Sequence, residues 1–287
     1  MSAARSGKMS LVMWVCGLLL WPGLASAWQT HVATAANTSG NSTYLDVYYA
    51  NGNPNRLLLV TPVYNPTGAS GVYNNHPIGV WYDAARGRWA IFNQDHATMP
   101  VGAAFSVSDG NASSNNVVHR AAAANISGHM TWLDNPYANG QPNAFVYVTA
   151  NWNPGGVGGT YNSHPVGVWY DAVRGRWAIF NQDFAAMPEG ASFNVVYLQA
   201  SFVQTATAAN TSSHVTFINN AQCNGNQTST LFVTANWNPP GSAGVYNNHN
   251  LGTWYDTASG RWAIFNQDFG AMPPGASFNV WVLNVPW

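Results

Sequence analysis

One nine-residue segment occurs three times in the chain and determines how the rest of the sequence is divided. Gly-Arg-Trp-Ala-Ile-Phe-Asn-Gln-Asp stands at 87–95, 175–183 and 260–268. Asn37, Asn125 and Asn210 repeat at the same offsets, 88 residues and then 85, so no gap falls inside a copy. A repeat of this length predicts three copies of one structural module. The three-residue difference falls in the connector 108–117, which is rich in Ser, Asp, Gly and Asn and is typical of a linker.

The first 27 residues have the composition of an export signal. Arg5 and Lys8 precede an apolar stretch at 11–20, and Ala25-Ser26-Ala27 matches the small-x-small pattern of a signal-peptidase site. We therefore expect cleavage near Ala27 and a secreted, periplasmic or cell-surface location. The apolar stretch is shorter than the roughly 20 residues that a membrane helix needs, so no transmembrane segment is expected.

The charge of the remaining chain limits its partners. Residues 28–287 carry seven arginines, no lysine and ten acidic residues, a formal charge of −3. Nucleic acids and anionic membranes require clustered cations, so a neutral partner is favoured over either. Cys223 alone remains after cleavage and stands where the other copies have Ala50 and Ala138, so no disulfide is expected within the chain and we interpret the cysteine as a small-residue exchange.

Short strands and turns account for the pattern within each copy. In the second copy, β-branched and aromatic runs bounded by Gly, Pro and Asn predict strands at 118–124, 129–133, 145–150, 166–170, 177–181 and 193–198. Strands of this number and length predict an all-β fold of three small β-sandwich or flattened-barrel modules. The expected division is a signal peptide at 1–27 and modules at 28–110, 116–200 and 201–287, strung in tandem as separate units. A single core shared between the copies is the alternative.

A hairpin lies at the centre of each predicted module. The loop 172–175 ends in Gly175, so Asp171 should face Arg176 across a four-residue connection. Counting outward from that pair sets Tyr170 against Trp177, Val168 against Ile179, Val166 against Asn181 and His164 against Asp183. The same count in the other copies pairs His76 with Asp95 and His249 with Asp268.

We interpret these His–Asp pairs as structural hydrogen bonds that hold the open end of each hairpin. A hydrolase that used the pair would need a nucleophile, yet Ser192 and Ser277 correspond to Ala104. Threonines recur in all three copies, but β-branched threonine is common in strands; these are Thr43, Thr131 and Thr216, and Thr61, Thr149 and Thr234. Two ligands are too few for zinc, whereas the oxygen atoms near Asn93-Gln94-Asp95 leave calcium open as a cofactor.

Two tryptophans are the candidate ligand contacts. Trp152 and Trp237 each lie in Asn-Trp-Asn-Pro before a Gly-rich loop, and Tyr64 takes their place in the first copy. Exposed aromatic faces stack on sugar rings while amides bind hydroxyls, so this motif predicts a site for neutral glycan or another cell-surface polymer. The predicted ligand-binding set is Tyr64, Trp152, Trp237, Asn151, Asn153, Asn236 and Asn238. The alternative interpretation assigns the tryptophans to the core, together with Trp89, Trp177 and Trp262.

The segments 75–83, 88–95 and 99–105 resemble a tandem-domain family of exported microbial proteins that has no established activity. The resemblance covers nearly all of 31–283 and implies an extracellular repeat protein without assigning a catalytic residue. The chain departs from the pattern at Asn250, where the other copies have Pro77 and Pro165, and at Val63-Tyr64. The sequence thus favours a multivalent binding protein over a structural or adhesive surface component, with a hydrolase third, and leaves self-association open.

Overall fold

A computed structural model describes residues 28–66, 68, 70–198, 201–240, 242 and 244–284. The predicted signal peptide and its cleavage site lie outside these residues. Nearly all regular structure in the described chain is β-strand, as the sequence predicted, with one short 3₁₀ turn, η1 (Pro154–Gly156). No helix in this part of the chain is long and apolar enough to cross a membrane.

Module 1 is built from two antiparallel sheets. Its strands are β1 (Trp28–Val32), β2 (Thr38–Ser39), β3 (Ser42–Tyr44), β4 (Leu57–Pro62), β5 (Ile78–Asp83), β6 (Arg88–Asn93) and β7 (Ala104–Gly110). One sheet has the order β1-β7-β4, and β2-β3-β6-β5 pair in the other. Residues of both sheets, including Leu58, Trp89 and Phe105, are buried in one apolar cluster, so the module is a two-layer sandwich.

Modules 2 and 3 repeat this arrangement. Module 2 has β8 (Asn116–Arg120), β9 (Ile126–Ser127), β10 (Met130–Trp132), β11 (Phe145–Asn151), β12 (Val166–Asp171), β13 (Arg176–Asn181) and β14 (Ser192–Leu198). Module 3 has β15 (Phe202–Thr205), β16 (Thr211–Ser212), β17 (Val215–Phe217), β18 (Thr230–Asn236), β19 (Leu251–Asp256), β20 (Arg261–Asn266) and β21 (Ser277–Leu283). Trp177 and Trp262 are buried like Trp89, which confirms the core interpretation for these three rings.

The hairpin register is confirmed residue by residue. Asp171 pairs with Arg176 and Val166 with Asn181, and the corresponding strands of the other modules pair in the same register. The predicted strand 118–124 is wrong at its end, since β8 stops at Arg120. The Asn125 side chain accepts a hydrogen bond from the Ala122 N–H (2.8 Å) and donates one to the Arg120 carbonyl (3.0 Å), which turns the chain there.

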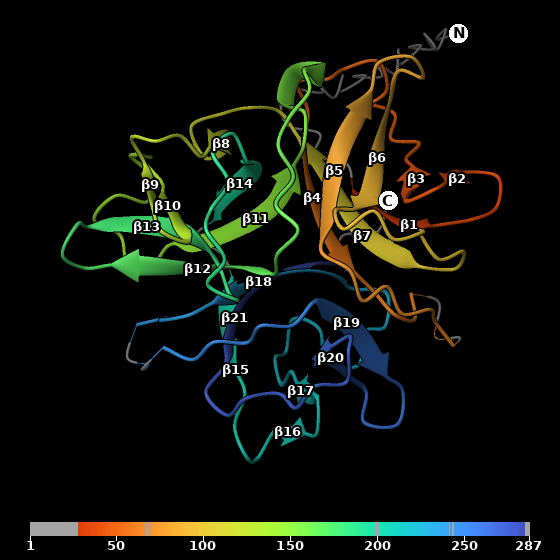
Figure 1. Cartoon of the computed structure of the whole chain (residues 1–287). Helices are drawn as coiled ribbons and strands as arrows, with labels where there is room; N and C mark the ends of the chain where they lie inside the picture. Colours follow the sequence, from red (N-terminus) through yellow and green to blue (C-terminus); the bar gives the residue numbers. More distant parts are fainter. Residues whose placement is uncertain are drawn as a thin grey trace, which may run out of the picture.

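The three modules form a closed ring around a central axis (Figure 1). β5 of module 1 pairs in parallel with β11 of module 2, and β12 of module 2 pairs with β18 of module 3. A parallel bridge between Val63 and Thr253 joins module 3 back to module 1. The expectation of separate units strung in tandem was therefore wrong in its arrangement. The use of 28–110, 116–200 and 201–287 as independent folding units stays a prediction.

Three threonine hydroxyls connect the modules in a cycle at the axis. Thr149 Oγ1 accepts a hydrogen bond from the Val60 N–H at 2.9 Å, and Thr234 Oγ1 accepts one from the Val148 N–H at 3.1 Å. Thr61 Oγ1 accepts from the Val233 N–H at 3.0 Å and completes the cycle. Each threonine thus satisfies a buried backbone donor of a neighbouring module, a role that strand propensity alone does not indicate.

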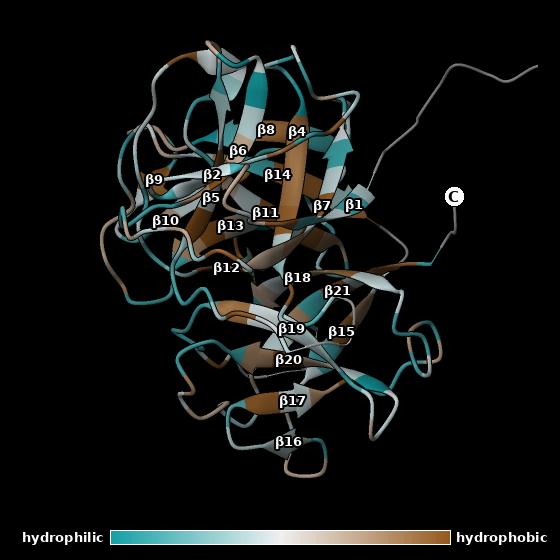
Figure 2. Cartoon of the chain, turned by 90° about the vertical axis from the view of Figure 1, so that its right-hand side faces the viewer, coloured by the Kyte–Doolittle hydropathy of each residue, from teal (hydrophilic) through white to brown (hydrophobic). Residues whose placement is uncertain are grey.

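An apolar cluster on the axis adds a core that all three modules share. Leu59, Tyr147 and Phe232 occupy equivalent positions on β4, β11 and β18 and are at most 3% exposed. The same central strands carry hydrophobic colouring in Figure 2, most plainly β4, whereas the outer loops are largely hydrophilic. Each module therefore has its own core and also contributes to a common one, which combines the two architectures that the sequence left open.

Candidate functional site

Asparagine side chains clamp each module to the next. The Asn153 side chain accepts from the Tyr82 N–H (2.7 Å) and donates to the Tyr82 carbonyl (2.8 Å). Asn238 makes the same two bonds to Tyr170, both at 2.9 Å, and Asn65 makes them to Tyr255. The side-chain amide bonds both the N–H and the carbonyl of one residue in a neighbouring strand. It thus makes the two hydrogen bonds that a paired residue in an adjacent strand would otherwise make.

The asparagines before the tryptophans are also bonded within the protein. Asn151 and Asn236 are 1% and 3% exposed, and each donates to the side chain of a second buried asparagine, Asn194 or Asn279, at 2.9 Å. The amide donors of Asn153 and Asn238 thus bond the neighbouring module, and those of Asn151 and Asn236 bond an asparagine of their own module. A role of these four asparagines in ligand binding stays a prediction.

The motif aromatics form three equivalent clusters, one at each junction between modules. Trp152 contacts Trp81 and Tyr161, with ring centroids 6.4 and 5.6 Å apart. At the next junction Trp237 contacts Trp169 at 6.1 Å and Tyr246 at 5.6 Å. Tyr64 lies 4.5 Å from Tyr73 and 6.2 Å from Phe265 at the junction that closes the ring. Each cluster combines rings from two modules, and Trp152, Trp237 and Tyr64 are all partly exposed.

The junction between modules 2 and 3 contains an open cavity of about 200 Å³. It is lined by His129, Met130, Trp169, Phe180, Trp237 and Tyr246. The lining is mostly aromatic and apolar, and the two indole N–H groups donate to no acceptor among the described residues. We use the name junction cleft for this cavity and for the equivalent aromatic clusters at the other two junctions. A shallow aromatic recess of this kind suits the apolar face of a ring-shaped ligand.

An aromatic side chain in a left-handed backbone conformation borders each junction cleft. His96, Phe184 and Phe269 have φ values of 65°, 64° and 62°, which bulky residues rarely adopt. Their rings pack against Tyr161, Tyr246 and Tyr73 at 4.6, 4.7 and 4.8 Å. The Phe184 and Phe269 side chains are nevertheless 57% and 55% exposed.

Strain of this kind, of order 1–3 kcal/mol per residue, is a mark of functional sites. The sequence analysis did not select these three residues. Their only signal is the place directly after the repeated Asn-Gln-Asp, where the Asp183 side chain accepts from the Ala185 N–H at 3.0 Å and turns the chain.

The predicted His–Asp contact is present in every module. Nδ1 of His76, His164 and His249 lies 2.6 Å from Oδ2 of Asp95, Asp183 and Asp268, at partly exposed positions. Burial acts to raise the pKa of Asp268, but the Gly270 N–H and the His249 side chain outweigh it and hold that pKa below its usual value. These contacts fit a bond that fastens the open end of the hairpin.

The serines and glutamines considered as partners of the pair make other contacts in the described structure. Ser192 and Ser277 each donate to a nearby backbone carbonyl, that of Gly190 or Gly275, at 3.1 Å. Gln94 and its counterparts accept hydrogen bonds from the next module's backbone, as in the 3.1 Å bond from the Asn162 N–H. Among the described residues, no three His, Cys, Asp or Glu side chains gather as a metal site. Calcium stays a prediction.

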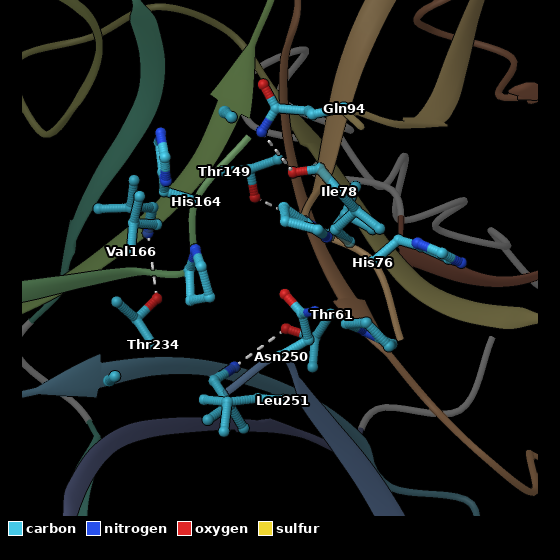
Figure 3. Close-up of a pocket in the computed structure, with 18 of the residues that line it drawn as sticks. Thr61, His76, Ile78, Gln94, Thr149, His164, Val166, Thr234, Asn250 and Leu251 are labelled. Carbon is cyan, nitrogen blue, oxygen red and sulfur yellow. Dashed lines mark hydrogen bonds between the residues drawn. The ribbon is translucent and has the colours of Figure 1, made fainter. Parts of the chain in front are cut away.

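A second cavity, of about 110 Å³, lies on the axis where the modules meet (Figure 3). Thr61, Thr149 and Thr234 line it, and their hydroxyls already accept backbone hydrogen bonds. Most of the remaining lining is apolar, with His76 and His164 directed away from its centre in Figure 3. This cavity is a consequence of ring closure and offers a ligand few free polar groups.

His–Thr contacts occur in modules 1 and 2, buried in module 1 and partly buried in module 2. His31 Nε2 and His119 Nε2 each lie 2.7 Å from a threonine hydroxyl, that of Thr43 or Thr131. Burial lowers the pKa of both histidines to about 4. Each threonine donates onward to an asparagine carbonyl oxygen, so the histidine is a neutral donor that supports the turn.

These features define a class: an all-β protein of three homologous sandwich modules closed into a ring, with aromatic clefts between them. The chain belongs to the family described as Domain of unknown function (DUF7452), whose sequence profile matches residues 19–107, 82–197 and 173–282. The three tandem matches confirm the resemblance to a repeat family without an assigned activity. No curated protein matches the chain, and no solved structure does.

Proposed function

We propose that the chain is an exported, multivalent binding protein that holds neutral glycans in its junction clefts. The observation that carries the proposal is the cleft between modules 2 and 3, where Trp169, Trp237 and Tyr246 line an open cavity. Faces of sugar rings are apolar and stack on such side chains, whereas ions gain little from them.

The exposed, strained rings support the same function. Phe184 and Phe269 keep large apolar faces in solvent at a backbone cost, although a glycine would relieve that cost. Three related clefts on one rigid ring would also raise the avidity for a repeating surface polymer without tighter individual contacts.

Two variants test the proposal. Trp237→Ala should weaken binding on a glycan array by about 1–3 kcal/mol, the range for ring stacking on nucleic-acid bases. Because Trp237 is partly buried, some loss of thermal stability should accompany it.

Phe184→Gly separates binding from folding. This change removes an exposed ring and relieves its left-handed backbone, so binding should fall while the melting temperature stays level or rises. Val173→Ala, at a side chain 95% exposed in the hairpin loop, is the matched control. Unchanged affinity in folded Phe184→Gly and Trp237→Ala would contradict the proposed site. Binding to no glycan would favour a structural or adhesive component instead.

A further inference from the structure

Modules 1 and 2 each contain a polar pocket beside the junction cleft. The polar pocket of module 1, of about 380 Å³, is lined by residues that include His31, Asn37, Tyr44, Asp46, Arg86 and Arg88. The equivalent pocket of module 2, of about 680 Å³, is lined by His119, Asn125, Trp132, Asp134, Arg174 and Arg176. Four of the seven arginines in residues 28–287 therefore line these two pockets.

The guanidinium groups are held in place before any ligand arrives. Arg174 lies over the Trp132 ring at 4.5 Å, and its Nη1 donates to Asp171 at 2.8 Å. In module 1, Arg86 lies over Tyr44 at 4.5 Å and donates to Asp83 at 2.6 Å. Stacking and the aspartate fix one edge of each guanidinium group and leave its other donors free to bind.

A second ion pair sets a carboxylate at the rim of each pocket. Arg88 contacts Asp46 at 2.6 Å, and Arg176 contacts Asp134 at 3.4 Å. The Asp46 and Asp134 side chains are 79% and 64% exposed, and each also accepts a hydrogen bond on Oδ1 from a neighbouring asparagine, Asn51 or Asn139, at 2.8 Å. Each module thus matches two guanidinium groups with two carboxylates, which leaves no excess charge to attract an ion.

In module 3, several residues that line the polar pocket of the other modules are replaced together. Module 3 has Ser259 in place of Arg174, Asn219 in place of Asp134, and Phe217 in place of Trp132. The ion-pair partners of the lost groups, Asp256 and Arg261, are retained. The lost arginine and the lost aspartate come from two different ion pairs and share only the pocket. Loss of a ligand contact therefore explains the joint change better than loss of one stabilising pair.

The polar pocket and the junction cleft are neighbours. Met130 lines the cleft and Trp132, two residues further along β10, lines the polar pocket, so both side chains project from the same face of the strand. The Trp132 ring contacts Trp169 of the cleft at 5.4 Å. Tyr44 makes the corresponding contact to Trp81 in module 1, at 6.2 Å.

We propose that polar pocket and junction cleft form one extended site at the junctions 1/2 and 2/3, and that its ligand is an oligosaccharide chain of several sugar units. This inference rests on the proposed function. The aromatic cleft holds one ring by stacking, while at the other end a sugar hydroxyl donates to the aspartate and accepts from the arginine. Only a group that both donates and accepts uses the two residues that module 3 has lost.

The test varies the length of the oligosaccharide. Affinities of the full protein are measured by calorimetry for a disaccharide, a tetrasaccharide and a hexasaccharide of one neutral glycan series. We expect affinity to rise roughly tenfold or more from disaccharide to hexasaccharide, the value of at least one charge-assisted hydrogen bond. The variant with Arg86→Ser, Asp46→Asn, Arg174→Ser and Asp134→Asn gives both pockets the residues of module 3 and should reduce hexasaccharide affinity to the disaccharide level.

Arg261→Ser is the control, because it removes the one pocket arginine that module 3 retains, the counterpart of Arg88 and Arg176. The Arg261→Ser variant should keep the rise in affinity from disaccharide to hexasaccharide. Equal affinity at all lengths, or a gain that survives in the fourfold variant, overturns the extended site but leaves the cleft proposal intact. Binding to no member of any neutral series overturns the proposed function and this inference together.

Discussion

The third module differs from the first two both in its pocket and in its junction with the next module. The junctions 1/2 and 2/3 each have two consecutive parallel pairs and a tryptophan in the cleft. Where module 3 meets module 1, strand pairing is reduced to the single bridge between Val63 and Thr253, which includes the bond from the Tyr64 N–H to the Thr253 carbonyl at 2.8 Å.

What stays constant across all three junctions is equally informative. The threonine hydroxyl and the asparagine clamp are present at every junction, including the one that closes the ring. The groups that vary are the cleft tryptophan, the polar-pocket residues, the strand pairing and the asparagine at the Ser106 position. The threonine hydroxyl and the asparagine clamp are therefore kept threefold, whereas candidate binding groups are concentrated at two junctions. This contrast within one chain separates residues needed for the fold from residues available for binding.

A change at the axis tests whether module 3 is as necessary to the ring as the others. Phe232→Ala should lower the free energy of unfolding by about 3–5 kcal/mol, because it opens a cavity in the cluster that all three modules share. Thermal denaturation followed by tryptophan fluorescence should show one transition shifted for the whole protein. A variant that melts in two steps, with modules 1 and 2 unaffected, would show that the axial cluster does not couple the modules.

Acid should affect modules 1 and 2 more than module 3. The folded-state pKa of His31 and His119, about 4, lies below the ordinary value of about 6.5, so the unfolded chain binds more protons between these limits. The stability that these histidines contribute is complete above pH 6.5 and is lost as the pH falls toward 4. At pH 5 the loss is roughly 2 kcal/mol for each histidine.

Module 3 has Gln204 where modules 1 and 2 have His31 and His119, so glutamine is the replacement that tests this acid response. Gln204 Nε2 donates to the Thr216 hydroxyl at 3.0 Å and so replaces the histidine donor without a titrating group. The double variant His31→Gln and His119→Gln should therefore flatten the pH dependence in urea denaturation measured at pH 7 and pH 5. His214→Gln, at a partly exposed position outside the His–Thr contacts, is the control. An unchanged slope in the double variant would show that these histidines do not set the acid response.

The smallest expected effect comes from restoring the missing contact at the closing junction. Asn194 and Asn279 donate to the Leu58 and Val146 carbonyls of the preceding module at 3.0 Å, while module 1 has Ser106 at this position. The double change Ser106→Asn and Val63→Asn should supply the amide pair and stabilise the protein by about 0.5–1.5 kcal/mol. A decrease in melting temperature would mean that this junction cannot accommodate the pair.

The structure within each module was predictable because its determinants are local. The four-residue loop fixed the hairpin register, and the register brought His164 to Asp183 across two strands. The nine-residue repeat likewise gave the number of modules. The extra strand β9 was missed because two residues carry too little pattern to be recognised.

The ring was not predictable, because its contacts are few and link residues far apart in the sequence. Thr61 and Val233 meet across 172 positions through one hydroxyl, and a threonine in a strand is ordinarily explained by propensity. The Asn-Trp-Asn motif was recognised as special but was assigned to ligand binding. Its second asparagine bonds backbone of the neighbouring module and its first bonds an asparagine of its own module, while the tryptophan of the third copy lines the cleft.

The cyclic threonine bonds have an evolutionary consequence. In an open array, duplication of a repeat lengthens the protein and leaves existing contacts intact. Here each hydroxyl already has its partner, so a fourth repeat would have to break one bond of the cycle and change the angle at every junction. We therefore expect the architecture to tolerate divergence among its repeats more readily than any change in their number, because diversity can accumulate only by substitution within a fixed set of three.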